Sequence, residues 1–382
     1  MGLKTRQLVI INQAANYLTV DLCNAFAKKI SNLTLITGNV HSQGKELDFK
    51  VNVRKINKYI EKPAFKKFLS HGRAFWGIFW LLKIRYRNHE VFFISQPPMG
   101  YLVNLLVGNK FTTLVWDVYP DILKVTGMQA GHPIYRAWSW LNYYSFKKAH
   151  TVFTIGEKMA VLLSQYVNPQ KIVIKKIWSA FQGAERIPKE ENPFIPLHNL
   201  KNKFVVQYSG NIGVTHKVEI ILELAEMLSK ETDIVFQIIG RGSRVESLQS
   251  IVLDKGLCSC QILPFQNDDL FLSSLSAADL GVVILDERVS SGSVPSKSYN
   301  LMSLGIPSLY ISSKDSEMEN YAVKYKHARN FPEQEISQIG NFILEIARNK
   351  ALWQEMSDYA LCASIDFRRN NADLIVEEYL SR

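Results

Sequence analysis

The sequence predicts an α/β protein made of two doubly wound parallel-sheet domains. Apolar strand-like runs alternate with helix-like segments along both halves of the chain, which is typical of parallel sheets covered by helices. At 382 residues, the chain is also long for a single hydrophobic core. A segment with three prolines and no periodicity, 183–202, separates the two alternating halves. We therefore expect a first domain over 1–180, a linker over 181–202 and a second domain over 203–364.

The first half contains six short apolar runs that we interpret as strands. These predicted strands are 7–12, 32–37, 49–54, 91–95, 111–116 and 151–155. Helices are predicted at 16–30, 64–87 and 133–148. The second half repeats the alternation, with predicted strands at 204–210, 234–240, 261–265, 280–285 and 307–311. Its predicted helices include 215–230, 268–277 and 297–304, and the C-terminal run 351–382 is interpreted as helical.

The net charge of +10 predicts an anionic partner. Nucleic acid, an acidic membrane surface and phosphorylated substrates all satisfy this condition. The N-terminal apolar run is too short for a secretory signal, so we interpret it as the first strand.

The segment 64–87, AFKKFLSHGRAFWGIFWLLKIRYR, combines aromatic and basic residues and contains no acid. Its apolar run ends at Lys83 after nine residues, whereas a membrane-spanning helix needs about 20. Helical spacing predicts an aromatic stripe beside the basic residues, so we expect residues 62–87 to lie on an anionic membrane surface. The stripe consists of Phe65, Phe68, Gly72, Phe75, Phe79, Leu82 and Tyr86. The alternative is a core helix packed on a sheet. A nucleic-acid partner is disfavoured because the stripe is too apolar.

Loops that follow strands of the second half carry the candidate ligand-binding residues, because open α/β sheets bind ligands at the carboxyl ends of their strands. In YSGNIGVTHK, Gly210 and Gly213 bracket a turn at a predicted helix N-terminus, where backbone N–H groups bind anions. The alternative is a purely structural pair of glycines. His216, in the same loop, is the histidine with a site rationale.

Two further loops follow the next two strands. IIGRGSR lacks the third glycine of a dinucleotide fingerprint, so we expect Arg241 and Arg244 to face phosphate or simply to lie at the surface. Pro264 and Phe265 end the third strand, where a loop can hold a flat base. The alternative for this pair is ordinary core packing.

The most specific segment is SSGSVPSKSYNLMSLGIP, 290–307. Pro295 and Ser296 suit a helix start, which puts Lys297 in the first helical turn. A cation is unfavourable there because the helix dipole prefers an acid. We therefore expect a bound anion between the lysine and the N-terminus of the helix. A diphosphate bound by backbone N–H groups, hydroxyls and Lys297 fits. The alternative is a lysine whose stem packs on the surface.

Taken in order, the segments YSGNIG, IIGRG, SAADLGVVIL and SVPSKSYNLMSLGIPSL resemble the nucleotide-sugar half of family 4 glycosyltransferases of the GT-B fold. In the first half, WDVYPDILKVTGM and SFKKAHTVFTIGEKM resemble acceptor-domain segments of the branch that builds bacterial surface polysaccharides. The resemblance covers most of 90–310. It implies two Rossmann-like domains facing a cleft, with 1–180 as the acceptor domain and 203–364 as the donor domain. It also implies that the last helix, 365–382, completes the acceptor domain.

The activity that this resemblance implies is a retaining transfer of sugar from a nucleotide sugar, with UDP favoured. The implied acceptor is a lipid-linked diphosphate sugar or oligosaccharide at the inner face of the cell membrane. We therefore expect a cytoplasmic, peripheral membrane enzyme with no nucleic-acid partner. The chain contains no D-x-D motif, and we expect a metal-independent reaction without a cofactor other than the nucleotide sugar.

The chain departs from the family pattern at several site positions. The family's two glutamates are replaced by Gly292 and Asn300, and Asp286 or Glu287 are the candidates to substitute for the first. Asn211 and His216 stand where the family tends to carry Arg and Lys. The expected donor-binding residues are Gly210, Asn211, Gly213, Arg241, Pro264, Phe265, Ser293, Ser296, Lys297 and Asn300.

Asp117 and Asp121, in WDVYPD, are the candidates for a catalytic base or an acceptor contact. The alternative for each is a helix cap or a salt bridge. If the donor phosphate itself takes the acceptor proton, these aspartates only position the acceptor. A sugar-nucleotide epimerase of the same fold, a nicotinamide oxidoreductase and a non-catalytic GT-B scaffold are the competing hypotheses.

Overall fold

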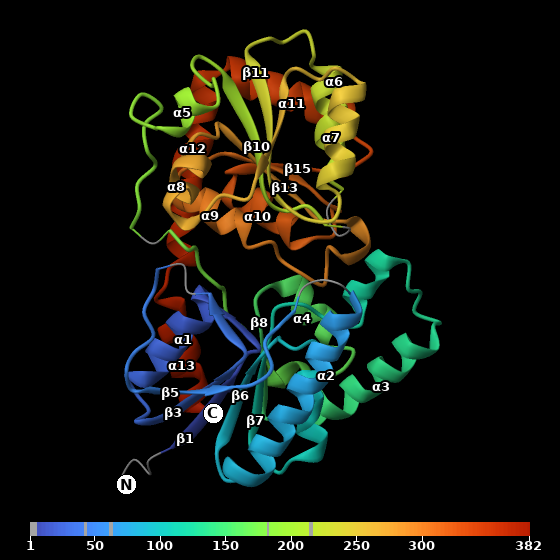
Figure 1. The fold of residues 1–382 in the computed structure, drawn as a ribbon, viewed down its shortest axis with the longest axis vertical. Coiled ribbons are helices and arrows are strands. Elements are labelled where there is room, and N and C mark those ends of the chain that lie inside the picture. The colour runs from blue at the N-terminus through green and yellow to red at the C-terminus, as the bar shows by residue number, and fades with distance from the viewer. Residues whose placement is uncertain (1–5, 42–43, 61–63, 182, 214–216) are drawn as a thin grey trace. The chain divides into compact units, whose positions relative to one another are not determined.

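The computed structural model describes residues 6–41, 44–60, 64–181, 183–213 and 217–382. They form two compact units (Figure 1). Unit 1 contains the chain up to Ala180 together with Arg369–Arg382, and unit 2 contains Phe181–Arg368.

Unit 1 is built on a seven-stranded parallel sheet in the order β5-β3-β1-β6-β7-β8-β9. Its strands are β1 (Gln7–Ile11), β3 (Asn32–Thr37), β5 (Val51–Lys55), β6 (Glu90–Ile94), β7 (Phe111–Val115), β8 (Thr151–Thr154) and β9 (Ile172–Ile174). The short strands β2 (Ala14–Asn16) and β4 (Asn39–His41) form a separate parallel pair. The strand order reverses between β1 and β6, as in a doubly wound fold.

Helices cover both faces of this sheet (Figure 1). One face carries α1 (Tyr17–Ala27) and the C-terminal helix α13 (Asn371–Ser381). The other carries α2 (Ala64–Trp80) with its π-helical extension (Leu81–Arg85), the 3-10 helices η2 (Gly100–Leu106) and η3 (Asp121–Thr126), α3 (Pro133–Lys148) and α4 (Glu157–Leu163). The C-terminal helix α13 is held in unit 1 by Tyr379, whose ring contacts those of Phe26 and Phe92.

Unit 2 is built on a six-stranded parallel sheet in the order β12-β11-β10-β13-β14-β15. Its strands are β10 (Phe204–Asn211), β11 (Ile234–Arg241), β12 (Cys260–Pro264), β13 (Leu280–Ile284), β14 (Ser308–Ile311) and β15 (Ala328–Phe331). Its helices are α5 (Phe194–Leu197), α6 (Glu219–Met227), α7 (Val245–Asp254), α8 (Asp268–Ser276), α9 (Lys297–Ser303), α10 (Glu317–Tyr325), α11 (Ile336–Arg348) and α12 (Lys350–Ser364). The order again reverses beside the first strand, between β10 and β13.

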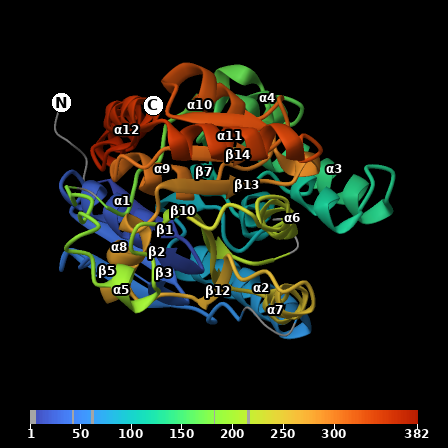
Figure 2. The same ribbon diagram turned by 90° about the horizontal axis from the view of Figure 1, so that it is seen from above.

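Alternate residues of the unit 2 strands build two cores, one on each face of the sheet. Val206 and Phe236 pack with α6 and α11 on one face, whereas Val205 and Val235 pack with α5 on the other. Figures 1 and 2 show helices on both sides of this sheet. The period of two that a strand imposes on its side chains produces this separation. The predicted class, a doubly wound parallel sheet in each half, is confirmed.

The structure differs from the sequence-based expectation at the expected linker and at two edge strands. Residues 181–202, expected as a linker, belong to unit 2, because Phe194, Ile195 and Leu200 are buried in its core. The edge strands β9 and β15 were not expected. They have only three and four residues, too few to produce a clear alternation.

The aromatic stripe predicted for the segment 64–87 is only partly buried. Ser70, Ala74 and Ile78, which lie outside the stripe, are buried in α2, and the stripe residues Leu82 and Tyr86 are buried beyond its end. Phe65 and Phe68 are 71% and 73% exposed. Phe75 and Phe79 are only half-buried. None of the helices in the described ranges is long and apolar enough to cross a membrane.

Candidate functional site

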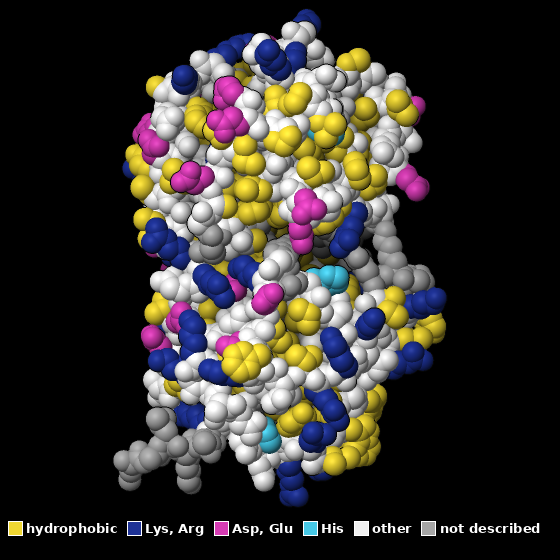
Figure 3. All heavy atoms as spheres, turned by 60° about the vertical axis from the view of Figure 1, so that its left-hand side comes forward, with side chains coloured by type: hydrophobic (Ala, Val, Ile, Leu, Met, Phe, Trp, Pro, Cys, Tyr) yellow, Lys and Arg dark blue, Asp and Glu magenta, His cyan; other side chains and the backbone are white. Residues whose placement is uncertain are grey.

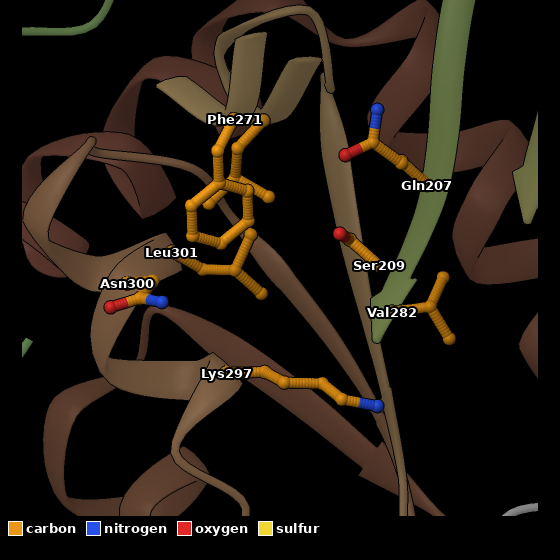
Figure 4. A pocket seen from close by; sticks show the side chains of 8 residues that line it. Gln207, Ser209, Phe271, Val282, Lys297, Asn300 and Leu301 are labelled. Atoms are coloured by element: carbon orange, nitrogen blue, oxygen red, sulfur yellow. The ribbon is translucent and has the colours of Figure 1, made fainter. Parts of the chain in front are cut away.

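The candidate donor site of unit 2 lies where β10 and β13 separate. The two strands pair only at Val206–Leu280 and Gln207–Gly281, so the carboxyl-terminal part of β10 is free of β13. Lys297 reaches from α9 toward the strands that carry Ser209 and Val282 (Figure 4). This is the point where the strand order reverses, at which open α/β sheets bind ligands.

A small pocket of about 30 Å³ surrounds the Lys297 side chain. Asn300 and Lys297 line it from α9, Gln207 and Ser209 from β10, and Phe271 from α8 (Figure 4). A space of this size holds about one water molecule, so a nucleotide bound here would lie largely outside it. The pocket brings together Lys297 and Asn300, two of the predicted donor-binding residues.

The ammonium group of Lys297 is buried and has no hydrogen-bond partner among the described residues. Its Nζ lies 3.7 Å from the centroid of the Tyr208 ring, a cation–π arrangement. Burial lowers the pKa of Lys297 to about 7. The Tyr208 hydroxyl donates to the backbone oxygen of Asn211 at 2.6 Å, which fixes the ring. A buried cation without a counter-charge is costly, and an anion beside it would remove that cost.

Glycines permit the close packing around this lysine. Gly210 has a φ of +149°, and a Cβ at this position would overlap the Lys297 side chain. A Cβ at Gly240 or Gly242 would overlap the backbone oxygens of Gly210 and Ile212. The G-R-G of the second strand is therefore explained by backbone packing against the first glycine loop. Gly213 has room for a Cβ only in tight contact with the Asn211 amide, at 3.1 Å.

Arg241 and Phe265 lie together at the ends of the neighbouring strands β11 and β12. The Arg241 guanidinium is 4.9 Å from the centroid of the Phe265 ring, and both side chains are exposed. Pro264, at the end of β12, is also exposed. Pro264 and Phe265 are therefore not part of the core. Arg244 instead forms an ion pair with Glu219 at 2.6 Å.

The remaining predicted donor residues occupy the loop before α9 and its first turn. Ser296 is exposed and caps α9 without a side-chain hydrogen bond, and Ser293 is half-buried. Asp286 is bound by Arg288 at 2.6 Å and caps a 3-10 turn. Burial raises the pKa of Asp286, but the hydrogen bonds from Arg288 outweigh burial and hold this pKa below its ordinary value. Neither Asp286 nor Glu287 lines the pocket. His216 lies outside the described residues.

Asp121 of unit 1 is buried in a network of side chains. Its carboxylate accepts hydrogen bonds from Tyr135 at 2.7 Å and Tyr166 at 3.0 Å, and Lys124 lies 2.7 Å away. These contacts are the ones expected if Asp121 is a salt-bridge residue, which was the alternative to a catalytic role. Asp117 lies in the loop after β7 and is only half-buried. The catalytic role of the two aspartates stays a prediction.

His71 has no site rationale in the sequence, and the structure places it in contact with Gln13, which follows β1. Gln13 donates its amide N–H to the backbone oxygens of Ser70 and Asn57 at 3.1 and 3.2 Å, which fixes its orientation. Its Oε1 therefore accepts from Nδ1 of His71 at 2.9 Å. Burial and the nearby Lys67 charge lower the pKa of His71 to about 4, so the ring is neutral at pH 7. Gln13 is 58 positions from His71, which is why no local motif reveals the pair.

Comparison with curated proteins finds two similar glycosyltransferases. The chain is 28% identical over 236 residues to "Probable glycosyltransferase WbjE" of Pseudomonas aeruginosa, across 60% of this chain and 57% of that protein. It is 31% identical over 104 residues to WcaI of Escherichia coli (strain K12), across 27% of this chain and 25% of that protein. WcaI is named as a glycosyl transferase of colanic acid biosynthesis. The matched part of this chain thus spans 57% of WbjE and 25% of WcaI, which is little more than half of either relative at most. No family model matches the chain.

Solved structures match along almost the whole chain. WaaG, a glycosyltransferase involved in lipopolysaccharide biosynthesis, matches with a TM-score of 0.71 and 11% identity over 96% of this chain and 98% of that one. HepE of Anabaena in complex with UDP-glucose matches with a TM-score of 0.73 and 11% identity over 98% and 99%. These likenesses concern the fold. The predicted resemblance to glycosyltransferases is confirmed by the two curated relatives, and the chain has the GT-B fold.

Proposed function

We propose that the protein is a retaining glycosyltransferase of bacterial surface-polysaccharide biosynthesis that takes a sugar from a nucleoside-diphosphate donor. The observation that carries this proposal is the buried, unpartnered ammonium of Lys297 where β10 and β13 separate. A diphosphate supplies the counter-charge that this ammonium lacks. The names of the curated relatives and the fold of the solved structures support the same activity.

UDP is the proposed donor nucleotide, because HepE, which shares the fold, binds UDP and UDP-glucose. Thermal unfolding with UDP, GDP, ADP and NAD, each without and with a chelator, tests this choice. A ligand at about 100 times its dissociation constant stabilises the folded state by roughly 2.7 kcal/mol. We expect UDP to raise the unfolding temperature, with no effect of the chelator. A shift with NAD alone contradicts the transferase proposal.

The proposed chemistry places positive charge where the diphosphate leaves. Lys297 and the stacked Arg241 are two cations of this region, and preorganised charges stabilise a leaving group without reorganising. The proton of the acceptor hydroxyl then goes to Asp117, to Asp121 or to the departing phosphate. Comparing the anomeric configuration of product and donor by NMR tests retention, and inversion contradicts it.

The proposed acceptor is a lipid-linked diphosphate saccharide at the inner face of the membrane, where α2 lies on the lipid surface. Trp76 and Trp80 are 55% and 56% exposed, and Lys66, Lys67 and Arg73 of the same helix are exposed as well. Figure 3 shows one face of the molecule, on which Lys and Arg side chains lie among exposed hydrophobic ones together with some Asp and Glu. Aromatic and basic residues together are typical of helices at a membrane interface.

Vesicle co-sedimentation tests this membrane contact. Replacing Phe65, Phe68, Trp76 and Trp80 by glutamine is expected to abolish binding to vesicles that contain an anionic phospholipid. The control is Leu253→Gln, which removes a 79% exposed apolar side chain from α7 of unit 2. Equal sedimentation of the two variants contradicts a role of α2.

A nucleotide-sugar epimerase and a non-catalytic scaffold are the competing functions. An epimerase converts the nucleotide sugar without any acceptor, whereas a scaffold binds UDP, if at all, without turnover. Incubation with UDP-sugars, followed by chromatography of the sugar products, separates these outcomes.

A further inference from the structure

Unit 1 contains an apolar groove of about 610 Å³ between α2, η2 and α3. Phe68, Phe75 and Trp76 line it from α2, Leu102 and Leu106 from η2, and Trp138 from α3. Its volume lies in the range of about 300–1,000 Å³ typical of ligand pockets. Phe68 and Trp76 are more than half exposed, and Leu106 is 48% exposed. Contiguous exposed apolar surface of this kind often marks a binding site.

The groove lies at the point where the strand order of unit 1 reverses. Pro97, which follows β6, is part of its wall, and so is His71, whose ring is bonded to Gln13 directly after β1. The β1–β6 boundary is the position at which doubly wound sheets bind ligands. The groove therefore connects the expected ligand position of unit 1 with the exposed aromatic side of α2.

The charge at the groove is positive. Lys67 lines it with an exposed side chain, and no acidic residue is found among its described lining residues. His71 also lines it, but its lowered pKa keeps it neutral at pH 7, so it leaves Nε2 to accept a hydrogen bond from a hydroxyl group. Apolar walls, one cation and a neutral acceptor complement a hydrocarbon chain attached to a phosphate that carries a sugar.

We propose that this groove binds the proximal hydrocarbon chain of a lipid-linked phosphate acceptor, with Lys67 beside the phosphate. The proposal rests on the proposed transferase function, since it names the part of the acceptor that unit 1 holds. A second copy of the chain or an amphipathic peptide would fill an apolar groove as well, but neither accounts for a cation without an acid.

Farnesyl diphosphate is the probe, with farnesol and inorganic diphosphate as its two separated parts. Binding is measured on the full chain by intrinsic tryptophan fluorescence, because Trp76 and Trp138 line the groove. We expect farnesyl diphosphate to bind at least ten times more tightly than either part. Binding of inorganic diphosphate alone with equal affinity places the interaction at a phosphate site and overturns the proposal.

Gly72 offers a variant that fills the groove without disturbing the protein. It lines the groove from α2, and a Cβ there would contact nothing within 4 Å. Gly72→Leu is therefore expected to fold, since leucine also favours a helix interior over glycine by nearly 1 kcal/mol, and to weaken binding at least tenfold. Gly77→Ala on the same helix, outside the groove lining, is the control for helix propensity.

Lys67→Gln tests the contact with the diphosphate separately from the contact with the hydrocarbon chain. It is expected to weaken farnesyl diphosphate binding and to leave farnesol binding unchanged. Equal affinities of wild type, Gly72→Leu and Lys67→Gln overturn the proposal. If a variant unfolds, a photoreactive farnesyl diphosphate analogue gives an independent readout on the wild-type protein. We expect it to label residues within 97–106, and labelling confined to unit 2 would contradict the proposal.

UDP binding is measured in the same samples, so that this inference and the transferase proposal fail separately. If the protein binds UDP but does not bind farnesyl diphosphate, only the groove assignment is overturned. Absence of UDP binding with lipid binding intact overturns the proposed donor chemistry instead. Dimers in sedimentation velocity that Gly72→Leu dissociates would assign the groove to a second copy and contradict a lipid.

Discussion

The ammonium of Lys297 lies 3.7 Å from the centroid of the Tyr208 ring, and this buried cation has no hydrogen-bond partner among the described residues. The lysine comes from the start of α9 and the tyrosine from β10, so their contact joins the two elements that border the candidate donor site. The electron-rich ring reduces the cost of the buried charge only in part. A diphosphate that enters this site completes the pairing.

Replacing Lys297 by methionine is expected to stabilise the ligand-free protein. The change removes a buried unpaired cation, and each kcal/mol gained raises the unfolding temperature by about 2–4 °C for a unit of this size. Because the folded pKa of about 7 lies below the ordinary 10.5, the unfolded chain binds more protons between these values. Wild-type stability therefore rises with pH in this window, and the advantage of the variant shrinks.

Differential scanning fluorimetry between pH 6 and 10 checks this expectation. Lys230→Met, at an exposed lysine of the same unit, is the control and is expected to have little effect. A Lys297→Met variant that is less stable than wild type at pH 7 would show that the lysine is already paired in the free protein.

UDP binding is expected to be accompanied by proton uptake. At pH 8 the free Lys297 is mostly neutral, because burial lowers its pKa to about 7, and a diphosphate beside it raises this pKa again. Calorimetric titration in buffers of different ionisation enthalpy should therefore detect uptake of about one proton at pH 8. The uptake should disappear in Lys297→Arg, whose guanidinium stays charged.

Gly210→Ala is expected to destabilise unit 2 by about 1–3 kcal/mol, because alanine rarely adopts a positive φ. Its methyl group would also displace the Lys297 side chain, so UDP affinity should fall as well. Gly213→Ala is the comparison, since it lacks the overlap with Lys297 and its Cβ meets only the side chain of Asn211. Urea unfolding and UDP titration of both variants measure the difference, and equal behaviour would contradict the proposed packing role.

Asp121→Asn distinguishes a structural role from a catalytic one. Asparagine cannot accept hydrogen bonds from both Tyr135 and Tyr166 through two oxygens, so we expect a loss of about 1–3 kcal/mol of stability. Asp117→Asn, at a half-buried position, should cost less stability. A variant of either residue that keeps its unfolding temperature but loses more than a hundredfold in turnover would be assigned to catalysis.

The sequence predicted the parallel sheets well because a buried strand is a compact apolar run. The strands β1, β6, β10 and β13 all lie within a residue or two of their predicted bounds. The sequence also singled out Lys297, because a cation in the first turn of a helix conflicts with the helix dipole, and this residue lines the pocket of unit 2; its role in donor binding stays a prediction. Local sequence was sufficient in these cases since each signal lies within one element.

The features that the sequence did not predict depend on contacts between distant segments. Which face of α2 is buried is decided by close packing, and Ala74 and Ile78 pack where the larger Phe68 does not. The bond between Gln13 and His71 joins a loop after the first strand to a helix 58 positions later. The apolar groove is likewise assembled from separate segments: α2, residues 97–106, Tyr119 with Leu123, and α3. The sequence singled out α2 and the segment that contains Tyr119 and Leu123, but it did not show that they meet.

The most direct test of the account is a titration of UDP into wild-type protein and into Lys297→Met under identical conditions. The account predicts that UDP binds to the wild type and that the variant, although folded and at least as stable, binds at least tenfold more weakly. UDP binding of equal affinity in the two proteins would contradict the donor site proposed at Lys297.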